Sequence, residues 1–484
     1  MSTQGTTLGK DAAHPPEMSD GVLARLGLRF AAWAEKWFPD AFVFAAIAVI
    51  VVAVAAVAHG LPVRSAVKAF GDGYWTLITF TLQQAVVAIG GYIIASSPPA
   101  SRLIARIARI PRTGRGAVAY IALISMILSL FNWAISLIFA GLLARAIAQR
   151  SDIRMDYRAA GAAAYLCMGA TWAMGLSSSA AQLQANPASM PPALLEITGV
   201  IPFTQTIFLW QSIALTLVLI VMSTIIAYYS APSEAAAKTA QDLGVDVRTV
   251  VEALPKREQP GEWLEYSPVI TLLICALGLG WLFLEFSSQN PLLAISKLNT
   301  YNFLLIIVGM LLHWTPRSFL NAAAKAVPTI TGIIIQFPLY GSIAALMTAA
   351  AVGGASLSDS LAHLFVSFTN SDTFPVVMGV YSAVLGFFIP SGGGKWLLEA
   401  PYVMQAANDL QVHLGWAVQV YNAAEALPNL INPFWMLPLL GILGIKARAI
   451  VGFTALQLVI HTPVVLFLLW AFSETLTYIP PVFP

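Results

Sequence analysis

Charged residues are scarce in this chain. Asp, Glu, Lys and Arg make up only 10% of its 484 residues, whereas hydrophobic residues make up 58%, and the mean hydropathy is +0.76. Soluble globular proteins carry about 25% charged residues, so these charges are too few to cover a water-exposed surface. The composition excludes an ordinary soluble protein and predicts a membrane protein whose surface is covered mainly by lipid.

Cysteine is nearly absent, and patterns typical of enzymes and metal sites are missing. Cys167 and Cys275 are the two cysteines, and both lie in apolar runs, which favours small packing roles over a metal site or a disulfide. The six histidines are scattered, and neither H-E-x-x-H nor G-x-S-x-G occurs. We therefore expect no enzyme, no cofactor and no metal. The net charge of +2 gives no reason to expect a nucleic-acid partner.

Long apolar runs are the dominant feature of the sequence. A membrane-spanning helix needs about 20 mostly apolar residues. The clear candidates are residues 41–58, 76–96, 207–229, 269–286, 302–313 with their flanks, 329–352 and 449–471. Three further apolar segments are interrupted by polar residues or by Gly and Pro, at 117–148, 159–181 and 376–443. Together these runs predict about ten crossings.

Lys and Arg are distributed unevenly between the connecting segments. Residues 102–115 contain five arginines and residues 145–158 contain four, and the polar loop 230–262 is also basic. Lys and Arg collect on the cytoplasmic side of membrane proteins, so these segments are predicted to be cytoplasmic, as is the N-terminal arm. The predicted external loops contain no Lys or Arg and comprise residues 190–203, 355–372 and 406–413.

This charge distribution predicts that two of the interrupted segments are hairpins. Residues 117–148 begin and end beside cytoplasmic arginines, so they must enter and leave on one side, and residues 374–406 form a second hairpin that enters from outside. Each hairpin precedes a broken span, at 159–190 and at 414–443. The sequence therefore predicts an all-α polytopic membrane protein with two inverted repeats, each containing a re-entrant helical hairpin and a broken transmembrane helix.

Four parts of the chain follow from this organisation. Residues 1–40 are predicted to be a cytoplasmic arm with an interfacial helix, since about forty polar or mixed residues precede the first apolar run and exclude a signal peptide. Residues 41–229 form the first half, residues 230–262 the cytoplasmic loop, and residues 263–484 the second half.

The hairpin turns and helix breaks contain the polar residues that indicate a binding site. Backbone at membrane depth must be hydrogen-bonded within the protein or line a cavity, and helix N-termini favour anions. Two tips and two breaks that meet at mid-membrane would suit a carboxylate. The candidate substrate-binding residues are Asn132, Trp133, Ser177, Ser178, Ser179, Ser391, Gly392, Gly393, Gly394, Lys395, Asn429 and Asn432.

Three charged residues lie within the predicted membrane region. An ionised side chain at mid-bilayer costs at least about 2.5–3.5 kcal/mol, so it indicates function by default. Lys395 and Glu399 are four residues apart and share a helix face, where they either neutralise each other or contact the ligand. Glu425 is the candidate site for a coupling proton or cation, and its alternative is a structural pair with Lys395.

The remaining candidates also have structural alternatives. Asn132 can serve as hydrogen-bonding glue between helices, and the serines can simply permit close packing. The glycines after Ser391 can form a plain tight turn. A passive channel would need a continuous polar pore, whereas paired, interrupted hairpins favour alternating access.

Six motifs follow one another along the chain: KWFPDAFVFA at 36–45, FGDGYW at 70–75, FNWAISL at 131–137, QFPLYGSI at 336–343, PSGGGKW at 390–396 and NPFW at 432–435. Together they resemble the short-chain fatty acid transporter family, which comprises permeases for acids of acetoacetate or butyrate size within the ion transporter superfamily. The resemblance extends from about residue 29 to residue 469.

The resemblance implies an elevator-type fold and a bacterial inner-membrane permease for short-chain fatty acids or small keto acids such as butyrate or acetoacetate. It implies a scaffold that forms a homodimer, a small carboxylate as substrate, and coupling to a proton, a cation such as sodium, or a counter-substrate. The binding tips fall at 132–133 and 391–394. The Ser-Asn-Thr tip of dicarboxylate relatives is absent here, which argues against carrying over their sodium sites and suits a monocarboxylate. A permease for another organic anion, such as a dicarboxylate or hydroxy acid, is the alternative.

Overall fold

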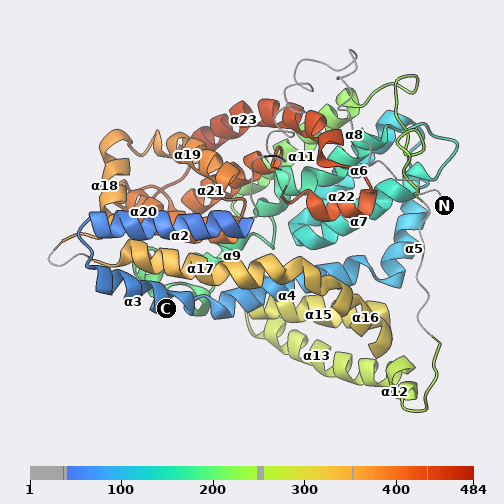
Figure 1. Ribbon diagram of the computed structural model, residues 1–484, viewed down its shortest axis with the longest axis horizontal. Helices are drawn as coiled ribbons and strands as arrows, with labels where there is room; N and C mark the ends of the chain where they lie inside the picture. Colours follow the sequence, from blue (N-terminus) through green and yellow to red (C-terminus); the bar gives the residue numbers. More distant parts are fainter. Residues whose placement is uncertain (1–35, 37–40, 248–255, 351–353, 433, 484) are drawn as a thin grey trace, which may run out of the picture.

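The computed structural model describes residues 36, 41–247, 256–350, 354–432 and 434–483. The predicted cytoplasmic arm and interfacial helix, residues 1–40, therefore lie outside the described residues except for Lys36. Within the described part of the chain, the regular elements are helices, accompanied by two isolated β-bridges. The predicted all-helical architecture is confirmed (Figure 1).

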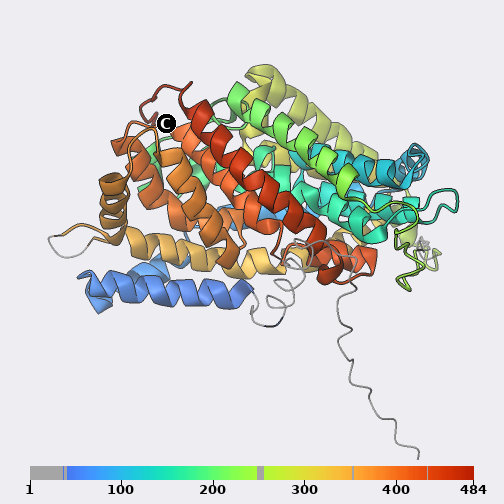
Figure 2. The same cartoon turned by 90° about the horizontal axis from the view of Figure 1, so that it is seen from above.

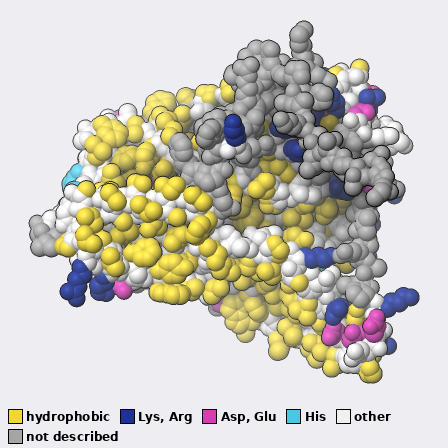
Figure 3. Space-filling model, viewed as in Figure 1, with side chains coloured by type: hydrophobic (Ala, Val, Ile, Leu, Met, Phe, Trp, Pro, Cys, Tyr) yellow, Lys and Arg dark blue, Asp and Glu magenta, His cyan; other side chains and the backbone are white. Residues whose placement is uncertain are grey.

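Seven helical segments among the described residues are long and apolar enough to cross a membrane. Two of them have largely exposed apolar surfaces, since only 22% of the apolar window of Pro268–Ser288 and 28% of that of Val451–Ser473 is buried inside the protein. Figure 3 shows hydrophobic side chains covering most of the visible described surface. A surface of this kind requires lipid as its solvent, so the protein is a multi-pass membrane protein.

The first half of the chain forms ten α-helices within the described residues. They are α2 (Ala41–Ala58), α3 (Val63–Tyr74), α4 (Ile78–Ala95), α5 (Pro98–Ile107), α6 (Gly114–Phe131), α7 (Trp133–Ala148), α8 (Tyr157–Leu166), α9 (Ser179–Gln184), α10 (Pro192–Thr198) and α11 (Trp210–Ser230).

The second half forms twelve α-helices within the described residues. They are α12 (Glu262–Tyr266), α13 (Pro268–Ser288), α14 (Pro291–Ser296), α15 (Leu298–His313), α16 (Pro316–Ala326), α17 (Thr331–Thr348), α18 (Leu357–Phe368), α19 (Phe374–Phe388), α20 (Gly392–Asp409), α21 (Leu414–Asn429), α22 (Leu437–Leu443) and α23 (Val451–Ser473).

Two pairs of consecutive helices form hairpins. Helices α6 and α7 contact each other and are joined at Asn132 alone, whose extended backbone interrupts the helix. Helices α19 and α20 are joined by residues 389–391, and the N–H of Ser391 donates to Ile389 O at 2.8 Å. Proline at position 390 lacks an N–H, and it disfavours a helical conformation at the residue before it. Both interruptions lie where the sequence places the hairpin turns.

The first broken span changes its helical type several times. After α8 come a π-helical turn, Cys167–Thr171, and a 3-10 turn, Trp172–Met174, before α9 begins at Ser179. Gly175 allows this break to approach the first hairpin, because a Cβ there would lie 2.4 Å from Leu130 O. The neighbouring N–H of Leu176 donates to the same oxygen at 2.7 Å. The second span breaks after α21 and resumes at α22.

Helix contacts follow the same order in both halves of the chain. Helix α4 packs on α7 and α17 packs on α20, while α5 and α18 contact the same two hairpin helices. Likewise, α6 contacts α8 and α11, and α19 contacts α21 and α23. Figures 1 and 2 show α2, α3 and α17 along one side of the molecule, with α19, α21 and α23 on the other. Helix α20 connects the two groups because it contacts both α17 and α21.

Candidate substrate and coupling site

Three buried charged side chains form a cluster beside the second hairpin tip. The Nζ atom of Lys395, on α20, lies 3.0 Å from Glu399 Oε1 on the same helix and 2.8 Å from Glu425 Oε2 on α21. It also donates to Ser382 O at 2.8 Å and to Ser382 Oγ at 2.7 Å. The Tyr421 ring lies 4.4 Å from Nζ, within the range of a cation–π contact.

This cluster contains one more carboxylate than ammonium groups. Lys395 and Glu399 are fully buried, and Glu425 is 1% exposed. Glu399 Oε2 and Glu425 Oε1 have no hydrogen-bond partner among the described residues. A charge held away from water is costly unless it is paired. The arrangement therefore favours binding of one additional positive charge, and a proton is the smallest group that supplies it.

The second tip presents the N-terminus of α20. Ser391 caps this helix because its Oγ accepts a hydrogen bond from the N–H of Gly394 at 3.2 Å. The first N–H groups of an α-helix have no acceptor within the helix, which here concerns Gly392 and Gly393. Lys395 follows directly, so backbone donors and an ammonium group occur within the first turns of one helix.

Aromatic rings pack directly against the glycines of the second tip. A Cβ at Gly392 would lie 2.2 Å from the Trp172 ring, and a Cβ at Gly394 would lie 2.1 Å from the Tyr340 ring. Side chains at these two positions would collide with rings that come from the first broken span and from α17. The glycines therefore permit a close contact of three elements and do more than form a turn.

At the first tip, Asn132 is buried and its amide is fully hydrogen-bonded. Its Oδ1 accepts from the N–H groups of Ala134 at 2.8 Å and Ile135 at 3.0 Å, which caps α7. Its Nδ2 donates to Val87 O at 3.1 Å and to Tyr301 Oη at 3.2 Å. In this conformation Asn132 holds the tip together, and a ligand would have to replace one of these acceptors.

Three consecutive serines connect the tips with the second broken span. Ser177 Oγ accepts from the N–H of Trp133 at 3.0 Å, at the first tip. Ser178 Oγ donates to Asn422 Oδ1, on α21, at 3.1 Å. Ser179 lies beside the second tip, since a Cβ at Gly393 would lie 3.2 Å from the Ser179 Cβ. The sequence identified these serines, but it did not identify Asn422 as a partner.

The residues that follow α21 hold the second tip from the other side. Asn432 Nδ2 donates to Phe387 O at 3.1 Å, and Trp435 Nε1 donates to Pro390 O at 2.8 Å. The Trp435 ring also meets the Trp133 ring edge-on, with centroids 5.5 Å apart, so it contacts both tips. Asn429, the last residue of α21, donates through Nδ2 to Met168 O at 3.3 Å.

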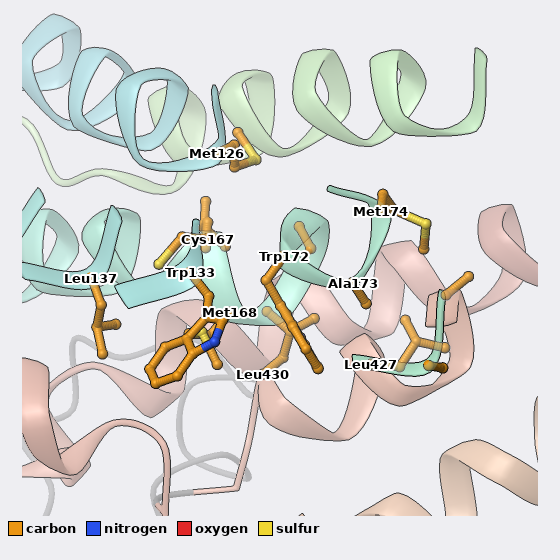
Figure 4. Packing of buried hydrophobic residues seen from close by; sticks show 14 of the residues in the cluster. Met126, Trp133, Leu137, Cys167, Met168, Trp172, Ala173, Met174, Leu427 and Leu430 are labelled. Atoms are coloured by element: carbon orange, nitrogen blue, oxygen red, sulfur yellow. The ribbon is translucent and has the colours of Figure 1, made fainter. Parts of the chain in front are cut away.

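The predicted site residues thus gather around the two tips, with additional residues that sequence reasoning missed. The missed residues are Trp172, Tyr340, Ser382, Tyr421, Asn422 and Trp435. Tyr340 and Trp435 stand in the QFPLYGSI and NPFW motifs, which is the signal that could have found them. Figure 4 shows Trp133 and Trp172 packed among other buried hydrophobic residues, which include Met168, Leu427 and Leu430. Among the described residues, no group of three or more His, Cys, Asp or Glu could hold a metal ion.

Comparison with known sequences places this chain among transport proteins. The family model described as short chain fatty acid transporter matches residues 22–472. The chain is 33% identical over 441 residues to a protein of Escherichia coli named "Putative short-chain fatty acid transporter", covering 90% of this chain and 95% of the relative. A protein of Haemophilus influenzae with the same name is 30% identical over 451 residues, covering 92% of this chain and 98% of the relative.

Two solved transporter structures share the fold. The YdaH transporter of Alcanivorax borkumensis matches with a TM-score of 0.59 at 15% identity, covering 95% of this chain and all of that one. MtrF of Neisseria gonorrhoeae, described with a class of antimetabolite efflux pumps, matches with a TM-score of 0.57 at 14% identity, covering 94% and 100%. Sequence identities this low support similarity of fold and nothing further. The match of family and relatives over nearly the whole chain shows that this protein belongs to the short-chain fatty acid transporter family, and that it is a transport protein and not an enzyme.

Proposed function

We propose that this protein is a secondary active permease that moves a short-chain monocarboxylate, such as butyrate or acetoacetate, across the bacterial inner membrane together with a proton. The observation that carries the proposal is the buried cluster of Lys395, Glu399 and Glu425 beside the capped N-terminus of α20. It combines an ammonium group for a carboxylate with an excess carboxylate for a proton.

Proton binding and substrate binding are coupled through the donor capacity of Lys395. Its Nζ has three hydrogens and faces four acceptor oxygens, on Glu399, on Glu425 and two on Ser382. Protonation of Glu425 weakens its attraction for Nζ, so a substrate carboxylate can take its place beside the ammonium group. Each ligand then raises the affinity for the other, as linkage requires.

The substrate carboxylate is proposed to bind at the second tip. The N–H groups of Gly392 and Gly393 and the positive end of the α20 dipole favour an anion there. Ser391, Ser179 and Lys395 surround this position, and movement of Trp172 or Tyr340 away from the glycines would give a ligand access to it. Asn132 and Trp133 are proposed to complete the site from the first tip, linked to it through Ser177 and Trp435.

Alternating access is proposed to follow an elevator mechanism with two inverted repeats and two re-entrant hairpins. The corresponding helix contacts in the two halves support this arrangement. The group of helices that contains both hairpins would move, while the group that contains α2, α3 and α15 would stay fixed and form a homodimer. The arginine-rich ends of α5 and α7 and the N-terminus are assigned to the cytoplasm, because basic loops remain there.

Uptake of radiolabelled butyrate into proteoliposomes tests the proposal. We expect saturable uptake that increases when the outside is made acidic and that does not respond to a sodium gradient. Uptake that responds to a sodium gradient alone would show that sodium, and not a proton, is the coupling ion. If neither uptake nor exchange of butyrate or acetoacetate occurs under any gradient, a short-chain acid is not the substrate. A dicarboxylate or hydroxy acid that is transported instead would establish the alternative substrate.

A further inference from the structure

Two cavities lie next to each other between α10, α17 and α20. The inner one, here called the apolar cavity, has a volume of about 220 Å³, and the outer one, the polar vestibule, has a volume of about 420 Å³. Ala193 and Thr348 line both, so the two are neighbours. The vestibule is lined by Glu196, Asp359, Gln405 and other polar residues near the end of α20.

The apolar cavity is lined by small residues of α17 and by side chains of α20. Gly341, Ala344 and Ala345 line one side, and Leu397 and Pro401 of α20 line the other. Its two hydroxyl groups are already engaged inside the protein. Thr76 Oγ1 donates to Gly73 O at 2.7 Å, and Thr348 Oγ1 donates to Ala344 O at 2.9 Å. An apolar cavity with no free donors binds apolar guests in preference to water.

The size of the apolar cavity fits a short hydrocarbon chain. A cavity of about 150 Å³ lined by aliphatic and aromatic residues binds benzene, which has six carbons. A volume of about 220 Å³ therefore accepts a hydrocarbon chain of that order of length.

The apolar cavity is lined by residues of α17 and α20 that lie close in the chain to the contacts of the second tip. Gly341 adjoins Tyr340, whose ring packs on Gly394. Leu397 lies on α20 four residues after Gly393, a distance of about 6 Å along the helix axis. A carboxylate held at the N-terminus of α20 can extend its hydrocarbon tail along α20 into this cavity when the Tyr340 ring, which packs on Gly394, moves aside.

We propose that the apolar cavity holds the hydrocarbon tail of the transported acid and sets the maximum chain length, with the polar vestibule as its entrance. This inference rests on the proposed function and adds the residues that select among monocarboxylates. Ala344 and Leu397 are the positions that determine chain length, because each lines the cavity from a different helix.

Uptake of acetate, butyrate, hexanoate and octanoate by purified variants in proteoliposomes tests this inference. Ala344→Leu fills the cavity, and we expect it to reduce uptake of butyrate and hexanoate relative to acetate. The expected loss is about fourfold for each excluded methylene, which corresponds to about 0.8 kcal/mol per buried CH₂. Ala344→Val should give an intermediate shift, so the effect can be followed even if the leucine variant folds poorly. Leu397→Ala should shift the preference in the opposite direction, towards hexanoate and octanoate.

Ala276→Leu serves as the matched control, since Ala276 is exposed on α13 and does not line the cavity. It should leave the order of preference unchanged. Loss of uptake by the same factor for all four acids in the Ala344 variants, or an unchanged preference in both the Ala344 and Leu397 variants, would overturn the inference. If the unmodified protein transports none of these acids, the proposed function itself fails, which distinguishes the two results.

Discussion

The Nζ atom of Lys395 lies 2.8 Å from Glu425 Oε2, which joins the helix that begins at the second tip to the helix of the second broken span. Gly386 of α19 makes this contact possible, because a Cβ there would lie 2.8 Å from the same oxygen. Three helices thus meet at one buried ion pair. Any change in the protonation of Glu425 therefore acts directly on the packing of the hairpin.

The first prediction concerns proton coupling. Glu425→Gln keeps the shape of the side chain but removes the excess carboxylate, leaving Lys395 paired with Glu399. We expect accumulation driven by an acidic exterior to fall to the level of passive equilibration, while exchange of butyrate continues. Proteoliposome uptake with and without a pH gradient measures both. Glu285→Gln, which alters an ion pair with Lys297 outside this site, is the control and should keep the response to pH. An unchanged pH response in Glu425→Gln would place the proton site elsewhere.

The second prediction concerns the stability of the charge cluster. Lys395→Met leaves two buried carboxylates without a cation, and breaking a buried pair in this way costs about 3–5 kcal/mol. Glu399→Gln should cost less, because Lys395 keeps Glu425 and Ser382 as partners. Thermal unfolding in detergent compares the variants, and the lysine variant should unfold at a clearly lower temperature. Adding Glu425→Gln to Lys395→Met should recover part of the loss, and a purely additive double variant would argue against direct coupling.

The third prediction concerns the contact between Tyr340 and the second tip. Gly394→Ala places a methyl group 2.1 Å from the Tyr340 ring, so the ring or the tip must move. We expect loss of most butyrate uptake, with partial recovery in the double variant Gly394→Ala/Tyr340→Ala, where space is restored. Gly280→Ala is the control, since a Cβ at this glycine of α13 meets no atom within 4 Å. Full uptake by Gly394→Ala would show that transport does not depend on this close contact between the second tip and Tyr340.

The fourth prediction separates the cap at the first tip from other helix caps. Asn132→Ala removes the cap of α7 and the bonds to Val87 and Tyr301, and we expect loss of uptake with normal membrane insertion. Thr113→Ala removes the cap of α6, where Thr113 Oγ1 accepts from the N–H of Gly116 at 3.1 Å, far from the tip. Loss of a helix cap alone costs about 0.5–2 kcal/mol of stability. If Thr113→Ala is destabilised as much as Asn132→Ala but keeps its uptake, the transport defect of Asn132→Ala is due to its place at the tip. Equal uptake in both variants would contradict a role for Asn132.

Local features of the structure were largely predictable from the sequence. The helix break at Asn132 and the interruption at Pro390 occur where polar residues, proline and glycine interrupt apolar runs, and backbone preferences there depend on neighbours in the chain. Helix α18 begins at a Ser356–Asp359 capping box, which is a local sequence signal for the start of a helix. Inverted topology, dimerisation and the coupling ion stay predictions.

Contacts between distant segments were not predictable in the same way. Trp172 lies against Gly392, and Ser178 donates to Asn422, yet nothing in the spacing of these residues relates one to the other. The apolar cavity is another example, because residues of α10, α17 and α20 line it together. Such relationships depend on helix packing, which fixes distances between residues of separate elements.

By itself, the sequence determined that this protein is helical, lies in a membrane and belongs to a family of short-chain acid transporters. Scarce charges and long apolar runs are properties of the chain alone, since transfer into lipid depends on composition and length. Only the tertiary structure decided which partners the buried charges have. Lys395 can reach Glu399 through the repeat of one helix, but it reaches Glu425 only because α19, α20 and α21 pack around a glycine. Burial then makes this one pair energetically decisive, because loss of either partner would leave an uncompensated buried charge.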